Sequence, residues 1–598
     1  MIIGMEVDVI IDRPLGSRHP AYDLIYPLNY GYVPGFIGGD GEEQDVYVIG
    51  VDVPLHQFHG VVIGVVERED DCESKWIVAS QQLKISVGEL EKQLYFQERY
   101  FKHTIYLKPN RIYRLAKEEE ACTIAQLVKN AITQTYPHYY PENIIDFFLT
   151  LHQEGAILKD IQEHKVFVLY DHGTLVATGT LNKASITRVY VHPFFQRGGY
   201  GTYVMDCLEE RARKRYDTIQ LDASLPAVMM YEKRGYQTIT HDCCIVNAKT
   251  TLVYEIMEKV LDEHQIDLLD VYHSELPDFL IELSKTPAML RLKEVGMHCG
   301  CEYTLYPRFQ FPCGYSRYEH SLGVALIIWH VTKDKVQAIA GLFHDIATPV
   351  FAHVIDFLHQ DYEKQESTEE RTRAFIEESK EIQRLLIKYG ITTQEVEDYH
   401  RYPIADNDSP RLSADRLEYT LGNFLCRGLH SKEEIKAMYE DLIVSEDEDG
   451  CMELAFQTKE IAKQFTLSCL NNSFHYISDE DRFSMQYLAN MIKDAIDCGI
   501  LTEEDLYTTE RQVIQKLQKH KKIRKMWNTF CEFHEICVVP KHVKNSVSIN
   551  AKKRMIDPLI HGSGRMSACS DECQRQMILL FTRDDKRRRI IDRSILET

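Results

Sequence analysis

Membrane-spanning and secretory segments are missing from this chain of 598 residues. No stretch approaches the ~18 consecutive apolar residues that a transmembrane helix needs. The opening sequence MIIGMEVDVIIDRP carries acidic residues where a signal peptide has a basic leader followed by an apolar core. We therefore expect a cytoplasmic protein without a membrane partner.

Paired CxxC spacing is also absent, although the chain has 16 cysteines. The nearest groupings are Cys243-Cys244, Cys299 with Cys301, and Cys569 with Cys573. None has the spacing of a structural zinc site. Scattered thiols of this kind fit a reducing compartment, where disulfides are rare.

Positive charge is in deficit, because 69 Lys and Arg residues stand against 91 Asp and Glu residues and leave a net charge of −22. This balance makes nucleic acid an unlikely partner of the whole molecule. The basic runs at 519–525 and 585–593 are expected to be solvated helix faces or an interface. A phosphate-bearing substrate must then be met by local cations, either metal ions or individual Arg and Lys side chains.

Low-complexity linkers and repeats of fixed period are absent as well, so domains have to be found from changes of pattern. The length exceeds what one hydrophobic core usually supports. Alternating strands rich in Val, Ile and Tyr come first, then mixed strands and helices, then a helical period. We predict a multi-domain protein with a small β-barrel (1–115), an α/β domain (116–262), an all-α domain (263–440) and a helical C-terminal extension (441–598). The short joins between the domains favour domains that pack together. The sequence does not decide whether the protein forms a homo-oligomer.

A set of histidines and aspartates in the helical part has the composition of a metal site. His320 precedes an apolar helical run, the pair His344-Asp345 ends another, and Asp415 begins a later one. Neutral nitrogen and charged oxygen together suit a divalent first-row metal and leave positions for water or phosphate. The alternative is that these histidines are hydrogen-bonded residues of the core.

The flanking segments SRYEHSLGV, AGLFHDI and ADRLEY resemble HD-domain metal-dependent phosphohydrolases, most closely the branch that hydrolyses deoxynucleoside triphosphates. The resemblance implies that a divalent metal (Mn, Fe, Ni or Zn) binds to His320, His344, Asp345 and Asp415. It also implies substrate contacts for Arg317 and Tyr419, and a catalytic role for His353, which matches the family together with Asp356.

The match to this family has two gaps. Thr348 stands where a second histidine usually follows the His-Asp pair, and Gln365-Glu366 stand where a catalytic His-Glu pair is expected. The metal ligands are therefore expected to be complete, and the catalytic residues around them altered.

Acidic residues gather in the turns of the first domain. The two groups are Asp40, Glu42 and Asp45, and Asp70 with Glu73. Carboxylates this close repel one another, so a site that holds several usually shares them around Mg²⁺. A solvated acidic loop is the alternative.

The segments DRPLGS, YPLNYGYVPG and DGEEQDVYVIG resemble family I inorganic pyrophosphatases. The resemblance implies that all five acids hold Mg²⁺, with Asp45 also catalytic, and that phosphate is bound by Arg13, Tyr30, Lys75 and Lys102. Glu42 replaces the usual central Asp, and the family's N-terminal segment with its active-site Lys and Glu is not matched. We therefore expect slow hydrolysis of pyrophosphate.

A glycine-bearing loop in the second domain, Gln196–Gly201, lies between a predicted strand and an amphipathic helix. Backbone N–H groups at such a helix start suit a pyrophosphate. With its context, YVHPFFQRGGYG and MMYEKRGYQ, the loop resembles GNAT-type N-acetyltransferases.

The GNAT resemblance implies acetyl-CoA and an unknown amine acceptor. The pyrophosphate of acetyl-CoA would lie on Gln196, Arg197, Gly198, Gly199 and Gly201, and its pantetheine on the backbone of Val189 and Val191. Tyr231 would reprotonate the departing thiolate, which a phenol can do because its pKa lies above that of a thiol. The alternative for Tyr231 is a packing aromatic.

These features predict a multifunctional enzyme that hydrolyses a nucleotide phosphate and pyrophosphate and transfers acetyl groups. The alternative is a regulatory or scaffold protein whose altered phosphohydrolase and pyrophosphatase-like domains bind nucleotide or phosphate without fast turnover.

Overall fold

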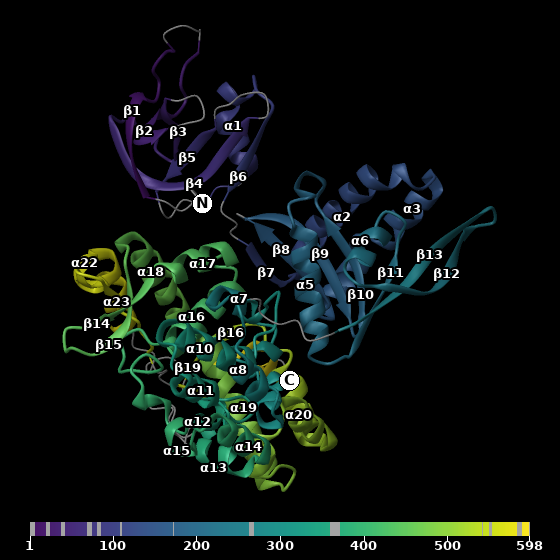
Figure 1. The fold of residues 1–598 in the computed structure, drawn as a ribbon. Coiled ribbons are helices and arrows are strands. Elements are labelled where there is room, and N and C mark those ends of the chain that lie inside the picture. The colour runs from purple at the N-terminus through teal and green to yellow at the C-terminus, as the bar shows by residue number, and fades with distance from the viewer. Residues whose placement is uncertain are drawn as a thin grey trace.

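The computed structural model describes residues 6–19, 24–37, 42–68, 74–80, 85, 87–107, 111–171, 173–261, 268–358, 371–540, 542–548, 553–582 and 589–596. Figure 1 shows three units in chain order, which we call the barrel domain (6–107), the sheet domain (111–261) and the helical domain (268–596). No helix within the described ranges is both long and apolar enough to cross a bilayer.

The barrel domain is a five-stranded barrel with one extra strand, as the alternating sequence predicts. Its strands are β1 (Glu6–Arg13), β2 (Asn29–Ile37), β3 (Glu43–Ile49), β4 (Gln57–Arg68), β5 (Lys75–Ala79) and β6 (His103–Leu107). They follow the order β1-β2-β3-β5-β4-β6, and β1 also pairs with β4, which closes the barrel. Only the β3–β5 pair is parallel among these pairings.

Alternation along the strands separates two apolar faces. Val46, Val48, Trp76 and Val78 belong to the cluster inside the barrel. The residues of opposite parity, among them Tyr47, pack against helix α1 (Val87–Glu98). Because both faces are covered, β5 is buried along its whole length, which explains its unbroken run of large apolar residues.

The sheet domain has a seven-stranded sheet in the order β12-β13-β11-β10-β9-β8-β7. The strands are β7 (Arg111–Leu115), β8 (Val166–Asp171), β9 (Thr174–Asn182), β10 (Ser185–Val191), β11 (Thr218–Ala223), β12 (Gln237–Asn247) and β13 (Thr250–Val260). Strands β8 and β9 form an antiparallel hairpin. Residues 111–115 pair with β8, so they belong to this sheet and not to the barrel in which we expected them.

Helices cover both faces of this sheet. Helix α5 (Tyr200–Arg213) packs on one face through Val204 and Leu208. Helices α2 (Ala121–Thr135), α3 (Glu142–Leu151) and α4 (Glu154–Gln162) contribute to the cluster on the other face. The short α6 (Val228–Lys233) follows β11.

The helical domain is built mainly from helices of 7 to 19 residues. They include α8 (Asp278–Ser284), α10 (Arg317–Thr332), α11 (Lys335–Phe343), α14 (Lys380–Tyr389), α16 (Ala414–Cys426), α17 (Lys432–Glu440), α18 (Lys459–Tyr476), α19 (Asp479–Asp497), α20 (Glu510–Lys519), α21 (Lys521–Phe530) and α23 (Asp571–Thr582). Shorter turns such as α12 (Val354–Leu358) connect them.

Two small sheets correct the expectation of a helical C-terminal extension over residues 441–598. One contains β14 (Leu442–Glu446), β15 (Met452–Phe456), β17 (Leu559–Ile560) and β18 (Gly564–Arg565), and the other contains β16 (Ile536–Val539) and β19 (Arg589–Asp592). Residues 452–456 lie within the expected helical extension. They form a strand because Gly450 makes a turn and α18 begins only at Lys459.

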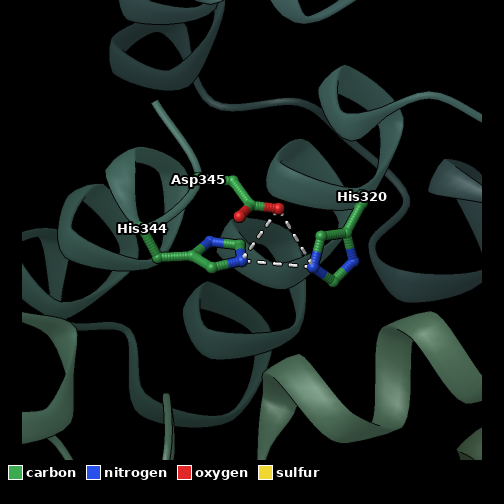
Figure 2. A group of neighbouring side chains, drawn as sticks. All are labelled: His320, His344 and Asp345. Carbon is green, nitrogen blue, oxygen red and sulfur yellow. Dashed lines mark hydrogen bonds and ion pairs between the residues drawn. The ribbon is translucent and has the colours of Figure 1, made fainter. Parts of the chain in front are cut away.

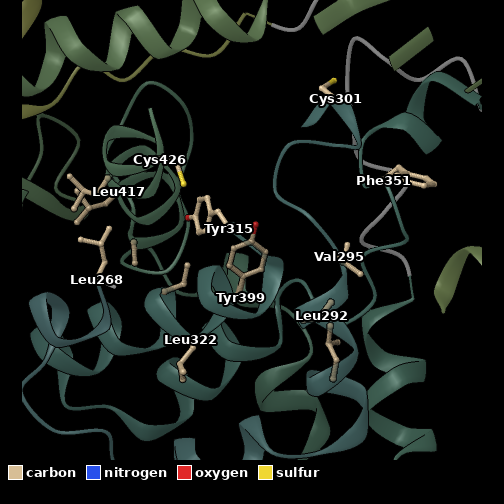
Figure 3. Close-up of a cluster of buried hydrophobic side chains, with 14 of the residues drawn as sticks. Leu268, Leu292, Val295, Cys301, Tyr315, Leu322, Phe351, Tyr399, Leu417 and Cys426 are labelled. Carbon is tan, nitrogen blue, oxygen red and sulfur yellow. The ribbon is translucent and has the colours of Figure 1, made fainter. Parts of the chain in front are cut away.

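A single apolar cluster runs through the whole helical domain, from Leu268 to Ile591. Figure 3 shows part of this cluster, including Leu268, Leu322 and Cys426. It joins Leu322 of α10 to Trp527 of α21. A boundary near residue 440 therefore does not separate two cores, and the C-terminal residues complete the domain instead of extending it.

The sheet and helical domains share a buried interface at the end of α5. Arg211 donates from Nη1 to Gln310 Oε1 at 3.1 Å and to the carbonyl of Thr304 at 3.3 Å. Lys214 donates from Nζ to the carbonyl of Glu302 at 2.7 Å. Leu305 packs into the core of the sheet domain. The segment 302–310 is thus held by α5.

Candidate functional site

Three helix ends bring the candidate metal ligands together in the helical domain. His320 lies in the first turn of α10, which starts with a capping box between Ser316 and Glu319, as the sequence S-x-x-E predicts. His344 is the C-terminal cap of α11. Asp415 lies in the first turn of α16.

The donor atoms of His320, His344 and Asp345 face one another (Figure 2). His320 Nε2 lies 3.1 Å from His344 Nε2, 3.0 Å from Asp415 Oδ1 and 3.8 Å from Asp345 Oδ2. His344 Nε2 lies 3.6 Å from Asp345 Oδ2 and 3.7 Å from Asp415 Oδ1. Around a divalent ion with bonds of about 2.1 Å, adjacent octahedral donors are about 3 Å apart. The donor atoms of His320, His344 and Asp345 all lie within 4.8 Å of one another and therefore fit a first-row metal, and Asp415 lies beside them.

The other ring nitrogen of each histidine is fixed by an acceptor. His320 donates from Nδ1 to Glu418 Oε2 at 2.6 Å, and His344 donates from Nδ1 to the carbonyl of Gly341 at 2.7 Å. With the proton on Nδ1, Nε2 presents its lone pair to the cluster, which is the arrangement of metal-ligating imidazoles. Gly323 makes room for Glu418, because a Cβ there would lie 2.7 Å from the Oε1 atom.

Asp345 is oriented by two side chains. Thr348 donates from Oγ1 to Oδ1 at 2.6 Å, and Arg317 donates from Nη1 to Oδ2 at 2.8 Å. Thr348, at the position where a histidine was expected, thus holds a candidate metal ligand in place. Arg317 contacts the candidate ligand Asp345 directly, and it also lines the cavity.

The acids of the cluster favour a positive charge at the point where the donor atoms converge. Burial alone would lower the pKa of His320, but hydrogen bonds to Asp415 and Glu418 raise it to about 10. Burial raises the pKa of Asp415, yet the hydrogen bond with His320 outweighs it and brings the pKa to about 2. A proton is thus bound strongly where the donors converge, in the place that a metal ion would take.

A histidine–aspartate pair stands beside this cluster. His353 donates from Nδ1 to Asp356 Oδ2 at 2.9 Å, and Asp356 is fully buried. Arg554 lies with Nη2 3.3 Å from His353 Nε2. Burial lowers the pKa of His353, Asp356 raises it, and Arg554 lowers it. The ring is therefore neutral at pH 7, with Nε2 able to accept a proton. Gln365-Glu366 lie outside the described residues.

A cavity of about 670 Å³ contains the cluster and extends well beyond it. This volume falls in the range of small-molecule sites. Tyr419, which we expect to contact substrate, lines it, and burial raises the pKa of its phenol. Burial also raises the pKa of Asp481 to about 7, so this carboxyl can hold a proton near neutral pH.

Several lining residues were not identified from the sequence: His298, Asn423, His475, Tyr476, Asp481, Lys553 and Arg554. Most of them come from α18, α19 and the segment before β17, far along the chain from the metal ligands. Glu418, which binds His320, was also not identified from the sequence. Its position could have been inferred, because it follows Asp415 by three residues and so lies on the same face of a helix.

In the barrel domain, the described part of the predicted magnesium site is a compact polar group. Tyr30 donates its hydroxyl to Asp45 Oδ2. Lys75, which is 2% exposed, donates from Nζ to the same oxygen and to the Tyr30 hydroxyl, each at 2.6 Å. Glu42 is exposed, whereas Asp40, Asp70 and Glu73 lie outside the described residues. The structure thus joins Tyr30, Asp45 and Lys75, as predicted.

Arg13 lies at the end of β1 with Nη1 2.9 Å from Asp12 Oδ2. Burial raises the pKa of Asp12; Arg13 lowers it and Asp45 raises it. The same charges act on Tyr26, so all four groups share one end of the barrel. Asp12 and Tyr26 were not identified from the sequence. Lys102 lies just before β6.

Strands β10 and β11 of the sheet domain separate after two residue pairs. Ser185 and Ile186 pair with β11, and beyond them β10 pairs only with β9 among the described strands. The edge of β10 that carries Val189 and Val191 is therefore open to a ligand backbone.

The loop Gln196–Gly201 leads into α5, whose N-terminal cap is Gly199 with φ of +77°. Arg197 has φ of +67°, and 196–199 are exposed. Successive left-handed and right-handed residues turn backbone N–H groups outward, which forms an anion-binding concavity at a helix start. Gly201 faces Val191. A Cβ atom at position 201 would lie 3.3 Å from the Cγ2 atom of Val191.

Tyr231 is buried on α6, close to a group of hydroxyls where β10 and β11 part. The Tyr136 hydroxyl lies 3.3 Å from that of Tyr190 and 3.3 Å from Ser224 Oγ. Burial, and then Tyr136, raise the pKa of Tyr231. Tyr136, Tyr190 and Ser224 were not identified from the sequence.

Comparison with known proteins gives one family match. Residues 135–251 match the model of the acetyltransferase (GNAT) domain, which lies within the sheet domain. Among solved structures, a GCN5-related N-acetyltransferase from Rhodopseudomonas palustris is similar, with 23% identity and a TM-score of 0.24, over 27% of this chain and 99% of that one.

Three curated relatives are similar in sequence. YdhJ of Bacillus subtilis, an uncharacterised protein, is 27% identical over 51% of this chain and 88% of that protein. The metal-dependent phosphohydrolase cns2 of Cordyceps militaris is 28% identical over 31% of this chain and 52% of that protein, so the match spans about half of it. An inorganic pyrophosphatase of Aeropyrum pernix is 28% identical over 21% of this chain and 88% of that protein. The chain thus carries a GNAT acetyltransferase domain and is similar in sequence to an inorganic pyrophosphatase and to a metal-dependent phosphohydrolase.

Proposed function

We propose that the helical domain is a divalent-metal-dependent phosphohydrolase that acts on the phosphate of a nucleotide. The observation that carries this proposal is the convergence of His320 Nε2, His344 Nε2 and Asp415 Oδ1, with both Nδ1 atoms fixed by acceptors. The four ligands would hold Mn, Fe, Ni or Zn, and such an ion supplies Lewis-acid polarisation of a phosphoryl group.

The residues around this site have the properties that the reaction needs. Arg317 lines the cavity, and its Nε is buried without a hydrogen-bond partner among the described residues. A phosphoryl oxygen would satisfy that N–H group. His353, neutral and oriented by Asp356, would move a proton at Nε2 to or from water or the leaving oxygen. Lys553 and Arg554 line the same cavity and add positive charge for a polyphosphate.

The test is metal analysis and phosphate release by the full-length protein over a panel of nucleotides, with Mg²⁺, Mn²⁺ and no added metal. Asp415→Asn keeps the size of the side chain and removes an anionic ligand, so we expect loss of both metal and phosphate release. Asp497→Asn, at the exposed end of α19, serves as the matched control. Full metal content in Asp415→Asn would contradict the site.

A regulatory role without turnover is the second candidate. It is favoured by Arg317, whose guanidinium already neutralises the Oδ2 atom of Asp345 that faces the histidines. Nucleotide binding by calorimetry, with no phosphate released under any metal, would support this candidate against hydrolysis.

We propose further that the GNAT domain transfers an acetyl group from acetyl-CoA to an amine. The pyrophosphate would bind at Gln196–Gly201 and the pantetheine along Val189 and Val191, and Tyr231 would return a proton to the thiolate. Gly199→Val forces a β-branched residue into φ of +77° and should abolish binding of acetyl-CoA. Equal affinities of the two proteins in calorimetry would rule this out.

For the barrel domain we propose slow, Mg²⁺-dependent hydrolysis of pyrophosphate. Support comes from Lys75 and Tyr30, which hold Asp45 at one end of the barrel, and from Arg13 nearby. Lys75 and Arg13 would bind phosphate, and the acids would bind Mg²⁺.

A further inference from the structure

A second hollow of about 540 Å³ adjoins the metal cavity and takes no part in the reactions proposed above. It is formed by the end of α16, the last turns of α18, the start of α19 and Arg308. His475 of α18 lines both the hollow and the metal cavity. We call it the Arg427 pocket, after the residue that sets its charge.

Arg427 is a partly buried cation held by neutral groups. Its guanidinium donates from Nη2 to Asn471 Oδ1 at 2.9 Å and from Nη1 to Asn472 Oδ1. No carboxylate pairs with it among the described residues. Burial lowers the pKa of Arg427, Tyr476 raises it and Arg308 lowers it, to about 10 in all. A desolvated cation that only amides contact is stabilised by any anion that reaches it.

The acidic residues of the pocket already have cationic partners. Glu480 Oε1 lies 3.2 Å from Arg308 Nε, and Asp479 pairs with Arg482. These carboxylates therefore do not compensate the charge of Arg427, and the pocket as a whole favours a negatively charged group.

Further hydrogen-bond donors surround this charge. The Asn471 oxygen accepts from Arg427, so its amide N–H groups remain to donate. Ser478 accepts from the backbone of Asp481 and keeps its own hydroxyl proton for another acceptor.

His475 adds an unsatisfied polar atom to the pocket wall. The residue is 4% exposed, and its Nδ1 atom is buried with no hydrogen-bond partner among the described residues. Burial, followed by Arg427 and Arg308, lowers the pKa of this imidazole well below its usual range. The ring is therefore neutral and offers one N–H donor and one acceptor.

We propose that the Arg427 pocket binds the phosphate group of a small phosphorylated ligand, separately from the substrate at the metal. A tetrahedral oxyanion has lone pairs for Arg427, Arg308 and the neutral donors together, which no single side chain of the pocket supplies. The half-buried ring of Phe474 lies at the same site and offers a face for the apolar part of that ligand. The proposal does not depend on hydrolysis at the metal.

The test follows hydrogen exchange of the full-length protein with methylenediphosphonate, a diphosphate mimic whose P–C–P link is not hydrolysed. Exchange is resolved by peptide, so the end of α18 and the start of α19 report on this pocket and not on the barrel or the GNAT loop. We expect protection of 471–481 that saturates with added methylenediphosphonate, equally in wild type and in Asp415→Asn, which lacks a metal ligand.

Arg427→Gln should weaken this protection about tenfold or more, because a charge-assisted hydrogen bond is replaced by a neutral one. Arg427→Lys keeps a positive charge at the end of α16 but loses the planar fork, so a smaller loss is expected. It also serves as the second variant if Arg427→Gln fails to fold. No protection in wild type, unchanged protection in both variants, or protection that disappears in Asp415→Asn would overturn the proposal.

Discussion

Two groups of carboxylates in this molecule are compensated in different ways. In the helical domain, the Asp415 oxygen faces two imidazole nitrogens, and the shared space binds a proton strongly. In the barrel domain, Asp45 already has a resident cation, because Lys75 lies 2.6 Å from its Oδ2 atom. The Asp415 oxygen is placed to meet an added ion, whereas Asp45 in the described part of the barrel is held by its own neighbouring side chains. The comparison teaches that acidic composition alone does not mark a metal site; the direction of the donor atoms does.

The largest expected effect comes from removing a donor that has no substitute. His320→Ala should empty the metal site and reduce nucleotide hydrolysis to background, because an imidazole ligand is lost together with its bond to Glu418. Metal content and phosphate release are measured together. The control is His330→Ala, an exposed position on the same helix. If His320→Ala retains its metal, His320 is not a ligand, and the helical site does not differ from the barrel site in the way described above.

His353→Gln should sharpen the comparison by separating chemistry from metal binding. Loss of a general acid–base group should slow nucleotide hydrolysis about 10²–10⁴-fold while the metal stays bound. His400 also pairs with an aspartate, Asp406 at 2.8 Å, and lines the same cavity. We expect His400→Gln to remain within a few-fold of wild type. Equal losses in both variants would remove the special role of His353.

Asp45→Asn tests the barrel in the same terms. It should slow Mg²⁺-dependent pyrophosphate hydrolysis about 10²–10³-fold, since it takes away the charge that Lys75 and Tyr30 orient. Nucleotide hydrolysis at the helical site should not change. Asp52→Asn, on an exposed loop after β3, is the matched control. A pyrophosphatase rate that survives Asp45→Asn intact would place that activity elsewhere in the chain.

The smallest effect concerns a third carboxylate pair, Glu302 and Glu510, which lies against Gly296 near α5. Burial, then the charge of Glu302, raise the pKa of Glu510 to about 8 from an unfolded value of 4.5. The folded state therefore holds the proton more tightly, so this group stabilises the fold fully below pH 4.5 and loses its contribution as pH rises through 8. The proton held by Glu510 compensates carboxylate charge in this pair, as Lys75 compensates the charge of Asp45 in the barrel.

Glu510→Gln should flatten that part of the pH dependence. The free energy of unfolding, measured with urea at pH 6 and pH 8.5, should fall between the two values by more in wild type than in the variant. The same fall in both proteins would show that Glu510 does not titrate in this range.

Much of the local structure could be read from the sequence, because its signals are local. The capping box of Ser316 and Glu319, the apolar run that ends at His344 and the alternation of the barrel strands each lie within one element. The helix expected at 452–456 was wrong because a run of five mostly apolar residues has no decisive period.

The remaining site residues could not be found because tertiary packing places them. Arg554 reaches His353 across 201 residues of sequence, and His475 arrives on a helix that carries no recognisable motif. Thr348, read as a missing histidine, holds Asp345 instead. Such roles follow from contacts between elements, and no pattern along the chain encodes those contacts directly.

The anchoring of segment 302–310 on α5 has a consequence for how this protein can be taken apart. Leu305 belongs to the core of the GNAT domain, and Arg211 and Lys214 of that domain have hydrogen-bond acceptors in the helical domain. A fragment cut between the two domains would leave an apolar gap on one piece and two cations without these acceptors on the other. We therefore expect residues 111–596 to behave as one expression unit and to be inherited as one block, so that recombination within a gene fusion would exchange the pair together.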